Sequence, residues 1–278
     1  MRVFYLLLAC WIIAEDLQAQ QLPLFTQYRE SHAFLNPASL HADQRVLSYR
    51  PNNMLGVSYR TQWTKLEDGP QTATARYEHI FSDLDMLGGL MLINDSAGPA
   101  STSGAYLRYA YLIEDKYSTL SIGLSAGVLN YKYDPNKGIL RDPGDLLGET
   151  PIVSTYADFS VGAFYYVEDN NNNLFYAGVS IPQIGTFQFD DAEDINRVPH
   201  FYGLAGYYFF ISDGLGSLNG TAFLEPSVWV KYAVNAPLQI EGNFRMFMAD
   251  AFWIGVGYAA ALSTADTNGA INGNNFHA

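Results

Sequence analysis

The chain has 278 residues, of which 49% are hydrophobic, 15% aromatic and only 15% charged, and its formal net charge is −13. An acidic chain without a basic stripe repels phosphate backbones, so nucleic acid is excluded as a partner. The abundance of Tyr, Phe and Gly at low charge favours strands and disfavours a helical bundle rich in Ala, Glu, Lys and Leu.

Residues 1–19 are typical of a secretory signal peptide. Arg2 gives a basic start, an almost unbroken apolar run covers 3–14, and Leu17-Gln18-Ala19 is a small-residue cleavage site. The residues before Cys10 also resemble a lipoprotein box, but the apolar run continues past that cysteine. We expect an exported protein whose mature form has no cysteine and needs no disulfide.

Between residues 54 and 262 the chain alternates apolar and polar residues with a period of two. In 238–246 the even positions are apolar except for Gly242, and the odd positions are polar. This pattern indicates strands with one apolar and one polar face, separated by turns such as Asp169–Asn173. Eleven strands are predicted, at about 54–63, 72–78, 86–94, 104–113, 120–128, 155–167, 173–181, 200–210, 222–233, 238–246 and 251–262.

A soluble β-sandwich and an outer-membrane β-barrel both alternate in this way, so strand length and aromatic placement must separate them. Sandwich strands usually have about 5–6 residues, whereas a tilted membrane-crossing strand needs about 9–11. Most of the predicted strands are close to ten residues, and aromatic pairs such as Tyr207 and Tyr208 gather near strand ends. We therefore predict an all-β fold, a transmembrane antiparallel barrel of the outer-membrane type.

The polar faces of these strands would then line the barrel lumen. Their charged members are Arg60, Arg76, Glu78, Arg108, Glu225, Lys231, Glu241 and Arg245. One interpretation is a set of hydrated ion pairs. The other is a basic-biased lumen that receives an acidic segment of the same chain or of a partner, with glycines such as Gly123 and Gly162 allowing close approach.

The sequence contains no H-E-x-x-H, P-loop or C-x-x-C motif. The five histidines lack metal-ligand spacing, and the acidic run 190–194 lacks the ordered spacing of a calcium loop. We predict no enzyme activity, no cofactor and no metal. A barrel hydrolase could still assemble Ser and His from different strands, with His79 and His200 as the histidines to test.

Several blocks of the mature sequence resemble the PorP/SprF family of type IX secretion system membrane proteins. The start of the match is Leu22-Pro23-Leu24-Phe25-Thr26-Gln27-Tyr28, followed by Asn36-Pro37-Ala38. Tyr59-Arg60-Thr61-Gln62-Trp63, Leu224-Glu225-Pro226-Ser227 and Phe252-Trp253-Ile254-Gly255 follow in the same order. The family tends to have a glycine soon after Asn-Pro-Ala, where this chain has Ser39-Leu40-His41.

The resemblance implies a non-enzymatic outer-membrane barrel of about 14 strands in Bacteroidetes-type bacteria, linked to type IX secretion and gliding motility. Its implied partners are outer-membrane lipid, periplasmic components of the secretion system and a secreted surface protein, such as the C-terminal domain of an adhesin. A small-solute porin or uptake channel is the main alternative, and a lipid-acting barrel enzyme is a third.

The expected organisation has three parts. A signal peptide (1–19) precedes an N-terminal segment (20–45) that lies in the lumen or forms a periplasmic cap, and the barrel covers 46–278. Eleven strands is an odd number, whereas bacterial single-chain barrels have an even number. We therefore expect either an incomplete C-terminus or a missed short strand such as 44–50. The candidate partner-binding or lumen residues are Phe25, Gln27, Tyr28, Asn36, Pro37, Arg60, Gln62, Trp63, Arg76, Arg108, Lys231 and Arg245.

Overall fold

The computed structural model describes residues 28–40, 51–65, 68–135, 151–184, 186–189, 199–212, 221–233, 236–248, 252–262 and 274–277. The predicted signal peptide, the candidate strand 44–50 and the acidic run 190–194 lie outside these residues.

One antiparallel sheet of 13 strands makes up almost all of the described chain. The strands are β1 (Asn53–Thr61), β2 (Gln71–Phe81), β3 (Met86–Ala97), β4 (Ala100–Glu114), β5 (Ser118–Tyr133), β6 (Ile152–Glu168), β7 (Leu174–Ile181), β8 (Thr186–Gln188), β9 (His200–Ser212), β10 (Ala222–Ala233), β11 (Leu238–Met248), β12 (Phe252–Leu262) and β13 (Asn274–His277). Consecutive strands are neighbours, except that β8 pairs with β6 and β7 pairs directly with β9.

The eleven predicted strands are all present, and several are longer than predicted. β5 and β6 pair continuously from Ser118↔Val167 to Tyr133↔Ile152. The sequence prediction missed β8 and β13, because runs of three and four residues are too short for a period of two to stand out. It also missed the single turn of 3-10 helix η1 (Ser82–Leu84) between β2 and β3.

The burial pattern of the sheet is inverted with respect to a soluble protein. Along β5, Leu120, Ile122 and Leu124 are exposed, whereas the intervening Ser121 and Ser125 are buried. On β1, Leu55 and Val57 are each 77% exposed. A sandwich would bury its apolar faces, so this pattern confirms the predicted membrane barrel.

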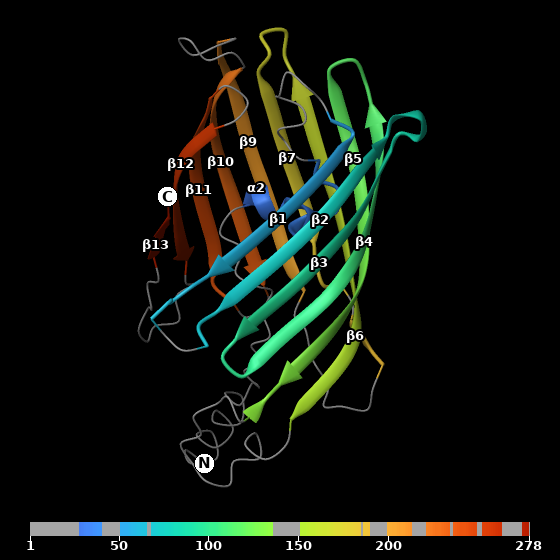
Figure 1. Cartoon of the computed structure of the whole chain (residues 1–278). Helices are drawn as coiled ribbons and strands as arrows, with labels where there is room; N and C mark the ends of the chain where they lie inside the picture. The colour runs from blue at the N-terminus through green and yellow to red at the C-terminus, as the bar shows by residue number, and fades with distance from the viewer. Residues whose placement is uncertain are drawn as a thin grey trace, which may run out of the picture.

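The sheet curves around a short helix, α2 (Tyr28–Leu35), which lies inside the curve behind β1–β3 in Figure 1. Among the described residues, β1 pairs with β2 alone and β13 with β12 alone, so the sheet is open between β1 and β13. Within the described part of the chain, no helix is long and apolar enough to cross a membrane.

The sequence analysis did not predict α2. An isolated helix of eight residues is below the roughly 12–15 needed for stability in water, so no strong helical pattern is expected. Tertiary packing stabilises it instead, since Ala33 and Leu35 are each 1% exposed. The helix ends at Leu35 because Asn36 precedes Pro37, and a residue before proline disfavours the α conformation.

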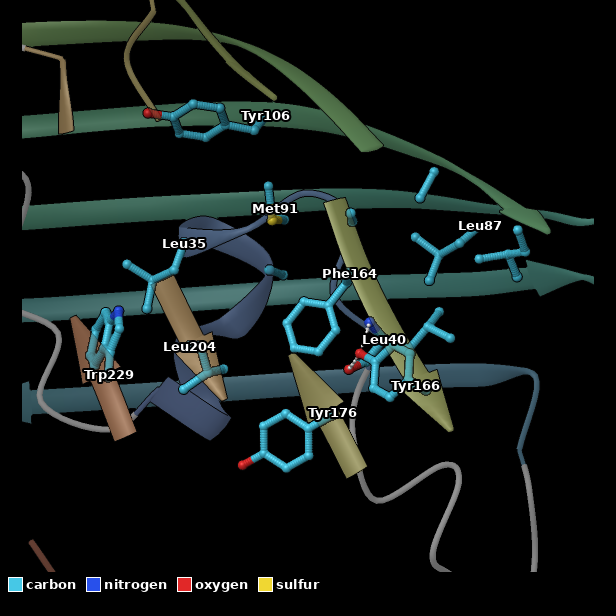
Figure 2. Close-up of a cluster of buried hydrophobic side chains, with 14 of the residues drawn as sticks. Leu35, Leu40, Leu87, Met91, Tyr106, Phe164, Tyr166, Tyr176, Leu204 and Trp229 are labelled. Atoms are coloured by element: carbon cyan, nitrogen blue, oxygen red, sulfur yellow. Dashed lines mark hydrogen bonds between the residues drawn. The ribbon is translucent and has the colours of Figure 1, made fainter. Parts of the chain in front are cut away.

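The apolar side chains inside the barrel are buried against one another and form a packed core. Leu35 and Leu40 lie among side chains from distant strands, including Met91, Phe164 and Trp229. Figure 2 shows these residues converging on the segment that contains α2. The core is therefore built between the sheet and this segment.

Candidate functional site

The most distinctive site is the N-terminal segment of residues 28–40, which we call the plug. It consists of α2 and the turn that follows it. The polar plug side chains His32, Asn36 and Ser39 are only 2%, 3% and 0% exposed. These residues therefore pack against the inner face of the sheet.

The turn after α2 is closed by the plug's own polar side chains. His32 Nδ1 and Ser39 Oγ are 2.9 Å apart, and Ser39 Oγ donates to the carbonyl oxygens of His32 and Asn36. Asn36 Oδ1 accepts a hydrogen bond of 2.9 Å from the backbone N–H of Ala38. Ser39 therefore holds the turn that follows α2 closed.

Side chains and backbone of the plug also bind the strands on one side of the barrel. Asn36 Nδ2 donates to the carbonyl oxygens of Ala163 on β6 and Val179 on β7, at 3.2 and 3.1 Å. Ser180 Oγ donates to the Leu35 carbonyl at 2.6 Å. These contacts join residues more than 120 positions apart in sequence.

Tyr166 on β6 holds the last described residue of the plug. Its hydroxyl accepts a hydrogen bond of 2.7 Å from the Leu40 N–H and donates one of 2.9 Å to the Leu40 carbonyl. Figure 2 shows this pair of contacts beside Phe164, whose ring stacks on Tyr166 with centroids 4.7 Å apart. The plug is thus anchored at both ends of its turn.

Arg108 on β4 joins the plug to a buried charge cluster. Its guanidinium donates to the carbonyl oxygens of Pro37, at 2.8 Å, and of Ser39, and forms an ion pair with Glu78 on β2. Glu78 Oε2 also lies 3.7 Å from both Arg76 Nε and His32 Nε2.

The charge cluster is almost completely removed from solvent. The side chains of Glu78 and Arg108 are 2% and 0% exposed. Buried charges need such partners because desolvation is costly. Glu78 is therefore the acidic centre that balances the basic residues around the plug.

Two glycines on the inner face make room for the plug. A Cβ at Gly123 would overlap the backbone of Pro37 and Ala38, and one at Gly162 would overlap the Asn36 side chain. Any larger residue at these positions would push the plug off the wall. The small residues noted in the sequence thus lie where the plug approaches most closely.

The opposite part of the lumen, formed by β10 and β11, carries its own ion pairs. Arg245 donates to Glu225 at 2.8 Å, and Lys231 to Glu241 at 2.9 Å. Each pair joins neighbouring strands, and Tyr176 also donates to Glu225. The lysine ammonium group lies 3.5 Å from the centre of the Trp229 ring.

The predicted candidate residues fall into separate groups. Asn36 and Pro37 belong to the plug, and Arg76 and Arg108 lie around it, whereas Lys231 and Arg245 belong to the opposite wall. Arg60 and Gln62 are half-buried at the end of β1. Trp63 follows β1 and is 68% exposed, with a positive φ of 51°. Tyr28 is the first residue of α2, and Phe25 and Gln27 lie outside the described residues.

Sequence reasoning missed four residues that hold the plug: His32, Ser39, Tyr166 and Ser180. Tyr166 and Ser180 occupy inward positions of the period-two pattern, which was the only available signal for them. Nothing in the pattern around His32 and Ser39 marked either residue as buried.

The two histidines considered for a hydrolase site do not come together. His79 lies near the end of β2 that leads to residues 82–85, and His200 starts β9 at the opposite end of the barrel. His79 Nδ1 contacts Asn53 Oδ1 at 2.8 Å in an exposed position. Across the described ranges, no group of three or more His, Cys, Asp or Glu side chains could hold a metal ion.

One known protein family matches almost the whole chain. The family model for type IX secretion system membrane proteins of the PorP/SprF type matches residues 17–277. No curated protein matches the chain. A solved structure, the β domain of the Bordetella autotransporter BrkA, has 11% sequence identity and a TM-score of 0.40, over 81% of this chain and 93% of that one. The chain belongs to the PorP/SprF family of type IX secretion system membrane proteins.

Proposed function

We propose that this protein is a non-conducting, non-enzymatic outer-membrane barrel that binds or anchors a secreted surface protein, such as an adhesin C-terminal domain, for the type IX secretion system. The observation that carries the proposal is the plug, because its buried contacts occupy a part of the lumen that an open porin leaves to water. The family supplies the link to secretion.

The proposed organisation keeps the three parts expected from the sequence. Residues 1–19 are the export signal, the segment 20–45 contains the plug, and the barrel follows. At one end of the barrel most connections are short, as in 82–85, 115–117 and 169–173, although 213–221 is longer. At the other end 134–151 and 182–199 are the longest, although 98–99 is short. Since outer-membrane barrels have short periplasmic turns and longer extracellular loops, we place the first end in the periplasm.

A bound partner would meet the mouths of the barrel and not its middle. At mid-height the inward side chains already bind the plug or each other, as with Arg108 and Glu78 or Arg245 and Glu225. Partners would therefore use the loops and the residues near the strand ends, where Arg60 and Gln62 lie. The excess of acidic residues in the loop sequences favours partner surfaces with basic residues.

Two measurements test this proposal. The purified protein in planar lipid bilayers should show little or no steady conductance, whereas a stable open conductance would establish the porin alternative. The detergent-extracted protein should co-purify with a secreted surface protein through that protein's C-terminal domain. Recovery of the barrel alone from cells that secrete such proteins would contradict anchoring.

The lipid-acting enzyme alternative has its own test. Single His79→Ala and His200→Ala variants should leave any lipase signal in the preparation unchanged. Loss of that signal in either variant would overturn the non-enzymatic assignment.

A further inference from the structure

An apolar groove of about 380 Å³ lies on the outer surface of the barrel, on the other side of the wall from the plug. Five strands, β5, β6, β7, β9 and β10, form it. Its floor consists of small residues, and larger side chains flank it. The outward floor residues are Ala163, Ala177, Gly203 and Ala205, the flanking ones include Leu120, Tyr165, Val179, Val228 and Val230, and the inward-facing Phe164, Gly178 and Leu204 complete the lining.

The strand register explains why this part of the wall is hollow. Ala177 is paired with Ala205 across β7 and β9, and Gly203 lies between Val179 and Val230 on its two neighbouring strands. Small residues on adjacent strands therefore meet at one height. A Cβ built on Gly203 would have nothing within 4 Å, so no neighbouring side chain fills the space.

The groove is continuous with the surface that faces the bilayer. Val179 is 63% exposed, and Tyr165 and Val228 are 40% and 41% exposed, as expected for the outward positions of the inverted sheet. An empty hollow on such a surface would lose dispersion contacts with the surrounding hydrocarbon. The hollow must therefore be filled by something from the membrane.

The chemistry of the lining selects among the membrane's components. The strands beneath the groove are paired on both sides, so no free backbone edge is available to an added peptide strand. No charged residue lines the groove, so the phosphates of lipid A have no cation to bind. An acyl chain needs neither, and a phosphatidylethanolamine carries its own ammonium group, so its phosphate needs no cation from the protein. We propose that this groove is a binding site for one acyl chain of a membrane phospholipid.

The same segment of wall also holds the plug from inside. The carbonyl oxygens that accept from Asn36 belong to Ala163 and Val179, and both residues line the groove. The wall between the plug and the groove is a single backbone layer with Gly162 on it. A bound acyl chain would thus pack against the strands to which the plug is anchored.

The experiment counts lipids retained by the full chain. The protein is transferred from nanodiscs of palmitoyl-oleoyl-phosphatidylethanolamine into detergent and measured by native mass spectrometry. Gly203→Phe places a ring in the groove and should reduce the retained phospholipid by one molecule per barrel. Ala105→Phe is the matched control, because Ala105 is an exposed residue of β4, and neither it nor its register partners Leu92 and Val128 line the groove. The control variant should retain as many phospholipid molecules per barrel as the unmodified chain.

The outcomes that overturn the proposal are distinct. Equal phospholipid retention by Gly203→Phe and the unmodified chain would show that the groove binds no acyl chain. Retention of lipid A in place of phospholipid, from nanodiscs that contain both, would reject the assigned ligand. A photo-crosslinker at Ala205 that captures a protein and not lipid in cells would do the same. Unchanged heat-modifiable migration of both variants confirms that they fold.

Discussion

The two sides of the lumen neutralise their charges in different ways. Around the plug, Arg108 and Glu78 are both almost fully buried and bind groups far away in sequence. On β10 and β11, Lys231 and Arg245 keep 15% and 12% of their side-chain surface exposed and pair with the adjacent strand. The first arrangement fixes a separate segment in the lumen, whereas the second completes the wall itself. Burial and sequence separation together thus identify which charges hold the plug.

The largest difference in the free energy of unfolding is expected between substitutions of the acidic residues on the two sides of the lumen. Glu78→Gln should lower the free energy of unfolding by about 3–5 kcal/mol, because it leaves buried Arg108 with an uncompensated charge. Glu241→Gln should cost clearly less, since Lys231 can be hydrated. Urea unfolding in detergent, followed by tryptophan fluorescence, compares the two variants. Equal losses of unfolding free energy in the two variants would mean that the ion pairs on both sides of the lumen are hydrated to the same extent.

The second prediction compares a glycine that faces into the barrel with a glycine that faces outward. Gly123→Val should cost about 1–3 kcal/mol and displace the plug, because the new side chain would overlap Pro37 and Ala38. Steady conductance in planar bilayers should then appear. Gly242→Val, at an open outward position, should remain closed and stable. If both variants stay closed, the plug is not the barrier to ions.

The third prediction compares asparagines on the two sides of the lumen. Asn36→Ala removes two hydrogen bonds to the wall and one within the turn, each worth about 0.5–1.5 kcal/mol. Hydrogen exchange of the plug amides should accelerate. Asn243→Ala, which removes a 3.2 Å hydrogen bond to Glu241, should leave those amides unaffected. Acceleration in both variants would show that the plug and the β11 wall open together.

The smallest effect on stability is expected at the turn that joins β6 and β7, which lies outside both the plug region and the wall formed by β10 and β11. The Asn173 side chain, helped by the backbone N–H groups of Asn173 and Asn171, holds the pKa of Asp169 below its ordinary value of 3.8. A depressed pKa stabilises the turn above pH 3.8, and this contribution is lost as the pH falls through the folded pKa.

Limited proteolysis between pH 6 and pH 3 measures this loss. Cleavage in 169–173 should increase at the acidic end in the unmodified chain. Asp169→Asn should be nearly independent of pH over the same range. A pH response that survives in this variant would assign the effect to another group.

The sequence by itself determined the sheet and its orientation toward the membrane. Period two over about ten residues is a local property, and Leu120 to Val128 shows which side chains are apolar without any knowledge of neighbouring strands. The inward positions of Arg76, Arg108, Lys231 and Arg245 follow from the same alternation. Family membership was also visible in short local blocks, beginning with residues 22–28.

Only the tertiary structure decided what the lumen contains. The plug is too short and too polar to show a helical or strand pattern, and its contacts join positions such as Asn36 and Val179 that no local rule connects. Helix α2 is stable because the barrel buries it, and Glu78 is central because three basic groups from different elements meet there. Such contacts depend on the closure of long loops in space, which local sequence periodicity does not encode.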